Sequence, residues 1–185
     1  SAMNLEDKFL EIIERKHKEL NLGKNYNEKF SKVRDFEANA IGQIGEEYIK
    51  YVISSITNII DDGVIHNEYD ILTESGLYFE VKTARKGRTN NTFQFNGINP
   101  RYNYNYLICL GVCENELLYR IFKKSEIVYI HKERNHFVIQ GDYKRQLVQM
   151  NPDNQVNFKL TISLRDLYNI SNLVNELKEK IKPNR

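Results

Sequence analysis

The chain has few cysteines and no long apolar run, and both features limit the classes of protein to which it can belong. Its two cysteines, Cys109 and Cys113, lie in the apolar segment YLICLGVC. Because no further Cys or His pair has the spacing of a zinc site, we expect buried, reduced thiols rather than a metal centre or a disulfide. No apolar run approaches the ~18 residues of a membrane span. No signal-peptide pattern opens the chain, so we expect a soluble, cytoplasmic protein without a membrane partner.

A large excess of charge of one sign is also lacking. The 185 residues include 27 Lys and Arg and 25 Asp and Glu, which gives a net charge of +2. The total charge therefore does not indicate a nucleic-acid-binding protein, and local clusters have to decide. The sequence shows no repeats, low-complexity tracts or long linkers. Its length predicts a single domain over residues 3–185, with Ser1 and Ala2 as the remnant of an expression tag.

The segment EYDILTESGLYFEVKTAR is typical of a β-hairpin. Two stretches rich in strand-forming side chains, 68–73 and 77–84, flank the turn sequence Glu-Ser-Gly. Alternation along the second strand places Glu80 and Lys82 on one face. Pairing that is symmetric about the turn places Asp70 opposite Glu80, with Cβ atoms roughly 4.5–5.5 Å apart.

Two carboxylates at that separation repel each other, so the arrangement is favourable mainly when a cation lies between them. Mg²⁺ suits such a place, because it takes oxygen ligands and is commonly held by one or two carboxylates together with water and phosphate. Lys82, one strand step beyond Glu80, is placed to contact a water or a phosphate. The alternative is an ordinary amphipathic hairpin whose acids and lysine are solvated.

An Asp followed about ten residues later by Glu-x-Lys across a hairpin resembles the core of the PD-(D/E)XK nuclease superfamily. The resemblance implies that Asp70 and Glu80 bind a divalent metal and that Lys82 positions or activates the attacking water. Tyr69 stands where the eponymous proline would be, at a position that varies widely in the superfamily. The expected fold is a single α/β domain with a central mixed β-sheet flanked by helices.

The segment 35–57 predicts a helix, because apolar residues recur at steps of three and four: Ile41, Ile44, Tyr48, Val52 and Ile56. Gly42 and Gly45 each cost about 1 kcal/mol against Ala inside a helix, which indicates close backbone packing. The motif GxxGE resembles the first helix of many such nucleases. The resemblance implies Glu46 as an accessory catalytic acid and metal ligand. Glu47 stays open as the alternative, as do two merely solvated glutamates.

The segment after the hairpin, TARKGRTNNTFQFNGINPRYNYNY, mixes cations, amides and aromatic rings. Cations hold phosphates, amides read base edges and aromatic rings stack on bases. A polar surface loop is the alternative. The residues that we expect to contact DNA are Arg85, Lys86, Arg88, Asn90, Asn91, Gln94, Asn96 and Arg101.

The remaining pattern predicts strands at 106–112, in the sheet centre, at 117–122 and, as an edge strand, at 157–162. Helices are predicted at 4–22 and 163–181. The second of these, with Leu167, Val174 and Leu177, is the favoured dimer interface, and the first, with Phe9 and Ile13, is the other candidate.

Together these features predict Mg²⁺-dependent hydrolysis of phosphodiester bonds in double-stranded DNA by a homodimer that most resembles a type II restriction endonuclease. The catalytic residues would be Glu46, Asp70, Glu80 and Lys82. A structure-selective nuclease of the Holliday-junction resolvase or repair type would share all four. A non-catalytic DNA-binding module of the same fold and a hydrolase that acts on nucleotides or RNA also stay open.

Overall fold

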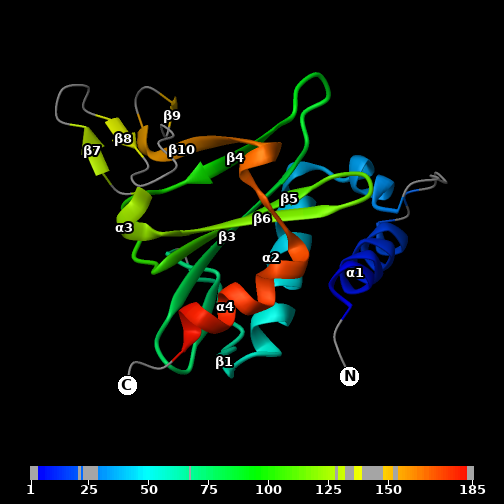
Figure 1. Ribbon diagram of the computed structural model, residues 1–185, viewed down its shortest axis with the longest axis horizontal. Helices are drawn as coiled ribbons and strands as arrows, with labels where there is room; N and C mark the ends of the chain where they lie inside the picture. Colours follow the sequence, from blue (N-terminus) through cyan, green and yellow to red (C-terminus); the bar gives the residue numbers. More distant parts are fainter. Residues whose placement is uncertain are drawn as a thin grey trace.

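The computed structural model of the chain describes residues 4–20, 22, 29–66, 68–127, 129–131, 136–138, 148–151 and 154–182. A mixed sheet of six strands lies at its centre, in the order β1-β2-β3-β5-β6-β11 (Figure 1). β3 and β5 are parallel, and the other neighbours are antiparallel. The predicted α/β class with a mixed sheet is confirmed. The strands are β1 (Ile59–Ile60), β2 (Ile71–Thr73), β3 (Tyr78–Arg85), β5 (Tyr106–Val112), β6 (Leu117–Lys123) and β11 (Tyr168–Asn169).

Helices pack on one face of this sheet. α1 (Leu5–Glu19), α2 (Ala38–Ser54) and α4 (Leu173–Ile181) bury their apolar stripes there in one core cluster with side chains of β3, β5 and β6. Three short 3₁₀ turns lie between the longer elements: η1 (Ser31–Asp35), η2 (Leu164–Asp166) and η3 (Ile170–Asn172). None of the helices among the described residues has the length and apolarity needed to cross a bilayer.

A second sheet covers the opposite face. It consists of β4 (Thr92–Ile98), β10 (Asn154–Ser163) and β9 (Val148–Asn151), in the order β4-β10-β9. Phe93 and Phe95 of β4 are fully buried and pack with Leu107 and Cys109 of β5 in a second core cluster. The protein therefore has three layers, with helices, the six-stranded sheet and the smaller sheet in turn. α3 (Lys124–Ile127) and the hairpin of β7 (Tyr129–His131) and β8 (His136–Val138) complete the described elements.

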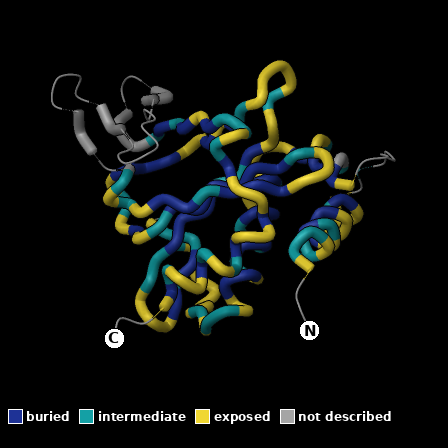
Figure 2. Tube along the Cα trace, viewed as in Figure 1, coloured by how far each residue is buried: buried dark blue, intermediate teal, exposed yellow. Residues whose placement is uncertain are grey.

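β5 is the central strand that its continuous apolar run predicts. It lies between β3 and β6, and six of its seven residues are buried. Both of the chain's cysteines are free thiols, as expected: Cys109 is buried on β5, and Cys113, just after it, is half-buried. In contrast, the connection between β3 and β4 projects from the molecule and is exposed (Figure 2).

Several predicted boundaries are wrong, chiefly in the C-terminal part. The last helix does not follow Ser163 but begins at Leu173, because residues 164–172 form η2, β11 and η3, and Tyr168 pairs with Tyr119. β10 is the middle strand of the second sheet rather than an edge strand. Both longer N-terminal helices are shorter than predicted, and Asp35 does not cap α2: it lies in η1, where His17 Nε2 is 2.9 Å from Asp35 Oδ2.

Both stripes proposed as dimer interfaces are occupied within the chain itself. Phe9 and Ile13 of α1 and Leu177 of α4 have at most 1% of their surface exposed and belong to the helix-side core. Leu167 is buried in the second core cluster. These side chains stabilise the monomer, so the prediction that either stripe forms the dimer interface is wrong.

Candidate active site

Asp70 lies immediately before β2 and beside β3. The antiparallel register of the hairpin, with Ile71 opposite Phe79, places Asp70 opposite Glu80, as the sequence predicted. The Asp70 amide donates a hydrogen bond of 2.9 Å to the Phe79 carbonyl. The Val81 amide, which has no partner on β2, donates one of 2.7 Å to Asp70 Oδ2. The strand edge therefore fixes both the backbone and the carboxylate of Asp70.

Glu80 is a buried acid beside a second acid. Only 8% of its surface is exposed. Burial, and then the charge of Asp70 and a hydrogen bond between the two carboxyl groups, raise the pKa of Glu80 to about 8, although Lys82 lowers it. Without a cation, the pair therefore holds a proton at neutral pH. A bound cation would favour the ionised form and displace that proton.

Lys82 lies on the same face of β3, two residues beyond Glu80. Its Nζ is 3.4 Å from Glu80 Oε1, and 25% of its side chain is exposed. β4 passes close to it at Gly97, which has a φ of +76° that favours glycine. A Cβ built at Gly97 would lie 3.5 Å from Lys82 Nζ. The ammonium group thus lies between the Glu80 carboxylate and Gly97 of the second sheet.

The structure separates the two candidate glutamates of α2. Glu46 lines the same groove as Asp70 and Glu80. Burial, and then the charge of Asp70, raise the pKa of Glu46. Glu47 instead forms an ion pair with Arg15 of α1. Glu46 is therefore the glutamate that belongs to the acidic cluster, which helix phase alone did not decide.

Gly45 explains how α2 comes so near to β3. A Cβ built at Gly45 would lie 1.7 Å from Thr83 Oγ1, so any larger residue would force the helix and the strand apart. Gly42 has no atom within 4 Å of such a Cβ. The predicted close packing is thus confirmed at Gly45 and wrong at Gly42.

The carboxylate oxygens of this cluster suit a hard cation, although three of them are not arranged around a common point. In the part of the chain that the structure describes, no group of three or more His, Cys, Asp or Glu is arranged to hold a metal ion. Half-buried Asp70 and buried Glu80 are nevertheless opposed, and they are electrostatically unfavourable as two anions. Mg²⁺ needs only one or two carboxylates and completes its shell with water and phosphate. The Asp70 and Glu80 carboxylates fit that requirement.

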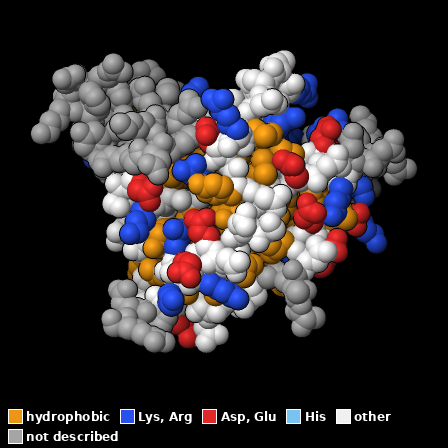
Figure 3. All heavy atoms as spheres, viewed as in Figure 1, with side chains coloured by type: hydrophobic (Ala, Val, Ile, Leu, Met, Phe, Trp, Pro, Cys, Tyr) orange, Lys and Arg blue, Asp and Glu red, His pale blue; other side chains and the backbone are white. Residues whose placement is uncertain are grey.

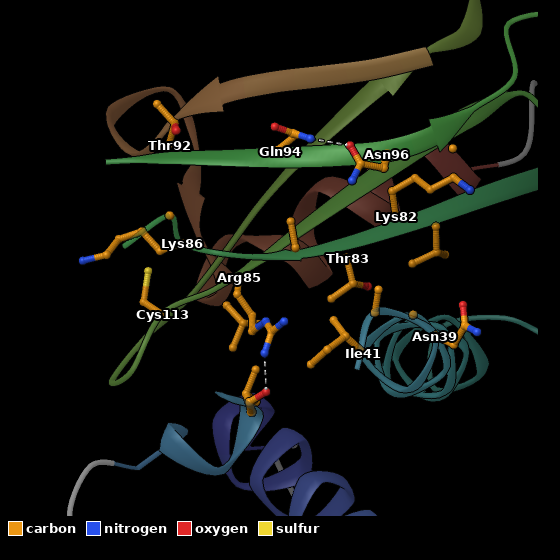
Figure 4. A pocket seen from close by; sticks show the side chains of 18 of the residues that line it. Asn39, Ile41, Lys82, Thr83, Arg85, Lys86, Thr92, Gln94, Asn96 and Cys113 are labelled. Carbon is orange, nitrogen blue, oxygen red and sulfur yellow. Dashed lines mark hydrogen bonds between the residues drawn. The ribbon is translucent and has the colours of Figure 1, made fainter. Parts of the chain in front are cut away.

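These side chains lie in a groove of about 1230 Å³. β3 crosses it, with α2 and η1 on one side and β4 with the β3–β4 connection on the other (Figure 4). Lys and Arg are interspersed with Asp and Glu over the face of the molecule seen in Figure 3, in keeping with the low net charge. The groove is therefore distinguished by the acids and the lysine that line it, and not by the overall charge of the protein.

Most of the residues predicted to contact DNA line this groove: Arg85, Lys86, Arg88, Asn90, Gln94 and Asn96. Asn91 and Arg101 are exposed and are not among the lining residues. Arg85 has a structural partner, because its Nη1 donates to the carbonyls of Val33 and Arg34 at 3.2 and 3.1 Å. Arg85 is thus engaged by η1, whereas Lys86 and Arg88 line the groove from the β3–β4 connection.

Sequence reasoning missed lining residues on both sides. Asn39 and Gln43 of α2 share the groove with Glu46, and their spacing of four and three residues is the helical signal that would have indicated a common face. Asn157 of β10 also lines the groove, and its Oδ1 is buried without a hydrogen-bond partner among the described residues. Nothing in the local sequence placed Asn157, because it reaches the groove through pairing of distant strands.

Neither a scan against protein-family models nor a search of the curated proteins finds a match for this chain. The case for a function therefore rests on the chemistry of the groove.

Proposed function

We propose that the protein is a Mg²⁺-dependent endonuclease that hydrolyses phosphodiester bonds in double-stranded DNA. The observation that carries this proposal is the opposition of Asp70 and Glu80 in the groove, with Lys82 Nζ 3.4 Å from the second acid. A buried carboxylate beside a half-buried one is costly for stability. Clusters of such acids with a lysine are typical of sites that bind a cation and a phosphate. The arrangement resembles the PD-(D/E)XK nucleases.

Asp70 and Glu80 would hold the ion, with Glu46 beside them. When bound, Mg²⁺ supplies Lewis-acid stabilisation of the phosphoryl oxygen and makes a bound water more acidic. Lys82 would donate a hydrogen bond to the phosphate or the attacking water and stabilise negative charge that develops there. The Val81 amide keeps Asp70 in place during this step.

The rest of the groove supports DNA as the substrate. Lys86 and Arg88 lie in the projecting connection, and both are exposed. Amide side chains from α2 and β4 face the groove from either side. Cations hold the phosphate backbone and amides read base edges. A sequence-specific enzyme of the type II restriction class best accounts for this combination.

A double-strand cut needs hydrolysis of two strands of opposite polarity. A two-fold homodimer supplies one active site for each strand in the matching orientation. We therefore propose a homodimer on DNA, formed through surfaces other than the buried stripes of α1 and α4. Sedimentation with and without a cognate duplex tests this. A single protein molecule that cuts both strands in one binding event would contradict it.

The test of the activity is incubation with Mg²⁺ and a complex duplex DNA. Discrete fragments that disappear when the metal is chelated are expected. A complete absence of cleavage, with DNA binding retained, would instead indicate the non-catalytic DNA-binding module.

One feature favours a structure-selective nuclease as the second candidate. Tyr69, next to Asp70, stacks on His66 at 4.6 Å between ring centroids and meets Tyr78 edge-on at 4.7 Å. In the same loop, 93% of the surface of Ile65 is exposed. Aromatic rings stack on unpaired bases, which branched DNA offers and plain duplex does not. Faster cutting of branched DNA than of any plain duplex would favour this candidate.

A further inference from the structure

Two amide side chains on β4 form a linked pair beside the active site. Gln94 Nε2 donates a hydrogen bond of 2.9 Å to Asn96 Oδ1 (Figure 4). Both residues are exposed and line the groove, whereas Phe93 and Phe95, which alternate with them, are buried beneath. Gly97, the next residue, is the one that approaches Lys82 Nζ. The amide pair thus stands directly beside the lysine of the proposed active site.

The hydrogen bond determines what Gln94 can still offer. One Nε2 proton is engaged by Asn96. Among the residues that the structure describes, the second Nε2 proton remains available as a donor and Oε1 as an acceptor. The two groups point in fixed relative directions from one planar amide. Without Asn96, the amide of an exposed glutamine would be free to turn over and exchange its donor and acceptor.

One donor beside one acceptor matches a single base edge in the major groove of DNA. Adenine presents its N6 amino group as a donor next to N7 as an acceptor. Guanine presents two acceptors, which would leave Gln94 Oε1 facing a lone pair. Cytosine presents only a donor, and thymine presents one acceptor and a methyl group.

We propose that Gln94 reads an adenine in the substrate by this bidentate contact and that Asn96 is the positioning residue that fixes the orientation of the Gln94 amide. The inference rests on the proposed function and adds the base that it recognises. Gln94 lies three strand steps from Gly97, which is roughly 10 Å. At 3.4 Å per base step, the adenine lies within about three base pairs of the cut.

The test uses the full-length protein, Mg²⁺ and a pool of duplexes with randomised sequence whose cut ends are sequenced. Adenine is expected to be enriched at one fixed position within about three base pairs of the cut. Duplexes that carry 7-deazaadenine there lack N7, and those that carry purine lack the N6 amino group. Each replacement should slow cleavage by roughly ten- to a hundredfold.

Variants distinguish recognition of the base by Gln94 from a purely structural role. Gln94→Ala should cut with the adenine preference lost and should no longer respond to either analogue. Asn96→Ala should weaken the preference of adenine over guanine, and Asn96→Asp should restore it, because a carboxylate oxygen still accepts the Gln94 proton. Asn175→Ala, which changes an exposed amide on α4, should match the wild type.

An unchanged base preference in Gln94→Ala, or normal cleavage of both analogues, would overturn the inference while leaving the proposed function standing. A wild-type protein that cleaves no DNA would overturn both. Because Gln94 is exposed and outside the core, its variant is expected to fold normally.

Discussion

The Asp70–Glu80 pair is unfavourable for the folded protein taken alone. Burial and the neighbouring acid raise the pKa of Glu80 to about 8. Lys82 is the cation that Glu80 contacts, at 3.4 Å, and it only partly offsets this effect. A divalent ion bound between the carboxylates would relieve the remaining repulsion. This repulsion destabilises the metal-free protein, so its relief favours binding of the ion.

The same pair predicts how stability depends on pH. Folded Glu80 keeps its proton to about pH 8, whereas the unfolded carboxyl loses it near 4.5. The folded state thus binds more protons between these values, and the free energy of unfolding should fall as pH rises through this window. In the Glu80→Gln variant, the side chain at this position does not ionise. The free energy of unfolding of the variant, relative to that of the wild type, should therefore rise by on the order of a few kcal/mol from pH 5 to pH 8.

Urea unfolding at several pH values, without divalent metal, measures this. Glu116→Gln, at an exposed glutamate, is the matched control and should follow the wild-type profile. Parallel profiles for Glu80→Gln and the wild type would show that Glu80 ionises normally in the folded protein.

The relative positions of Asp70, Glu80 and Lys82 could be predicted from the sequence, because strand alternation and hairpin symmetry determine them. The sequence could not decide whether Glu46 or Glu47 belongs to the acidic cluster. That choice depends on the ion pair of Glu47 with Arg15, which lies in another helix. The sequence also did not distinguish Arg85 from Arg88, because the carbonyls that Arg85 contacts belong to η1, more than fifty residues earlier in the chain.

Among the elements, α2 and β3 are the pair that assembles the site, and Gly45 sets their separation. Gly45→Ala should lower the free energy of unfolding by about 1–3 kcal/mol, because the new methyl group overlaps Thr83. Gly42→Ala is the matched control in the same helix and should raise stability by up to about 1 kcal/mol, since the site is open. Thermal or urea unfolding of both variants tests this. Equal effects would mean that Gly45 has no special packing role.

Arg85, the last residue of β3, and Arg88, in the β3–β4 connection, are expected to have different roles. Arg88→Ala should leave stability unchanged but reduce the slope of log affinity against log salt by roughly 0.9, as expected for one lost phosphate contact. Arg85→Ala should leave the slope nearly unchanged and lower the free energy of unfolding by about 1–2 kcal/mol, because it loses its hydrogen bonds to two η1 carbonyls. DNA titrations at several salt concentrations, together with unfolding curves, measure both. The reverse assignment of effects would contradict the structure.

Elements were predictable where the pattern was long and regular, as in α2, β3, β5 and β6. The C-terminal region was not, since its apolar residues recur at helical spacing although Leu167 and Ile170 belong to opposite core clusters. Tertiary packing of that kind overrides the local period. β4 was likewise described only as a polar and aromatic segment. Its strand character depends on pairing with β10, about sixty residues later.

Across the whole molecule, the candidate site lies where the three layers meet. The helix layer contributes Glu46, the central sheet contributes Asp70, Glu80 and Lys82, and the second sheet contributes Gln94 and Asn96. One core cluster packs the helices on the central sheet, and the other packs the second sheet on its opposite face. The groove is thus built on helices and strands, and the β3–β4 connection projects beyond them.

The most direct test of the central claim is the initial rate of cleavage of a labelled duplex in Mg²⁺, with DNA affinity measured in parallel. Asp70→Asn preserves the shape of the side chain and an oxygen that accepts from the Val81 amide, so it should fold and bind DNA normally. We predict that the wild type cuts and that Asp70→Asn cuts at least about a hundredfold more slowly, with Lys82→Ala similarly impaired. Cleavage by Asp70→Asn at the wild-type rate would contradict the account, because the hairpin would then not be the site of the chemistry.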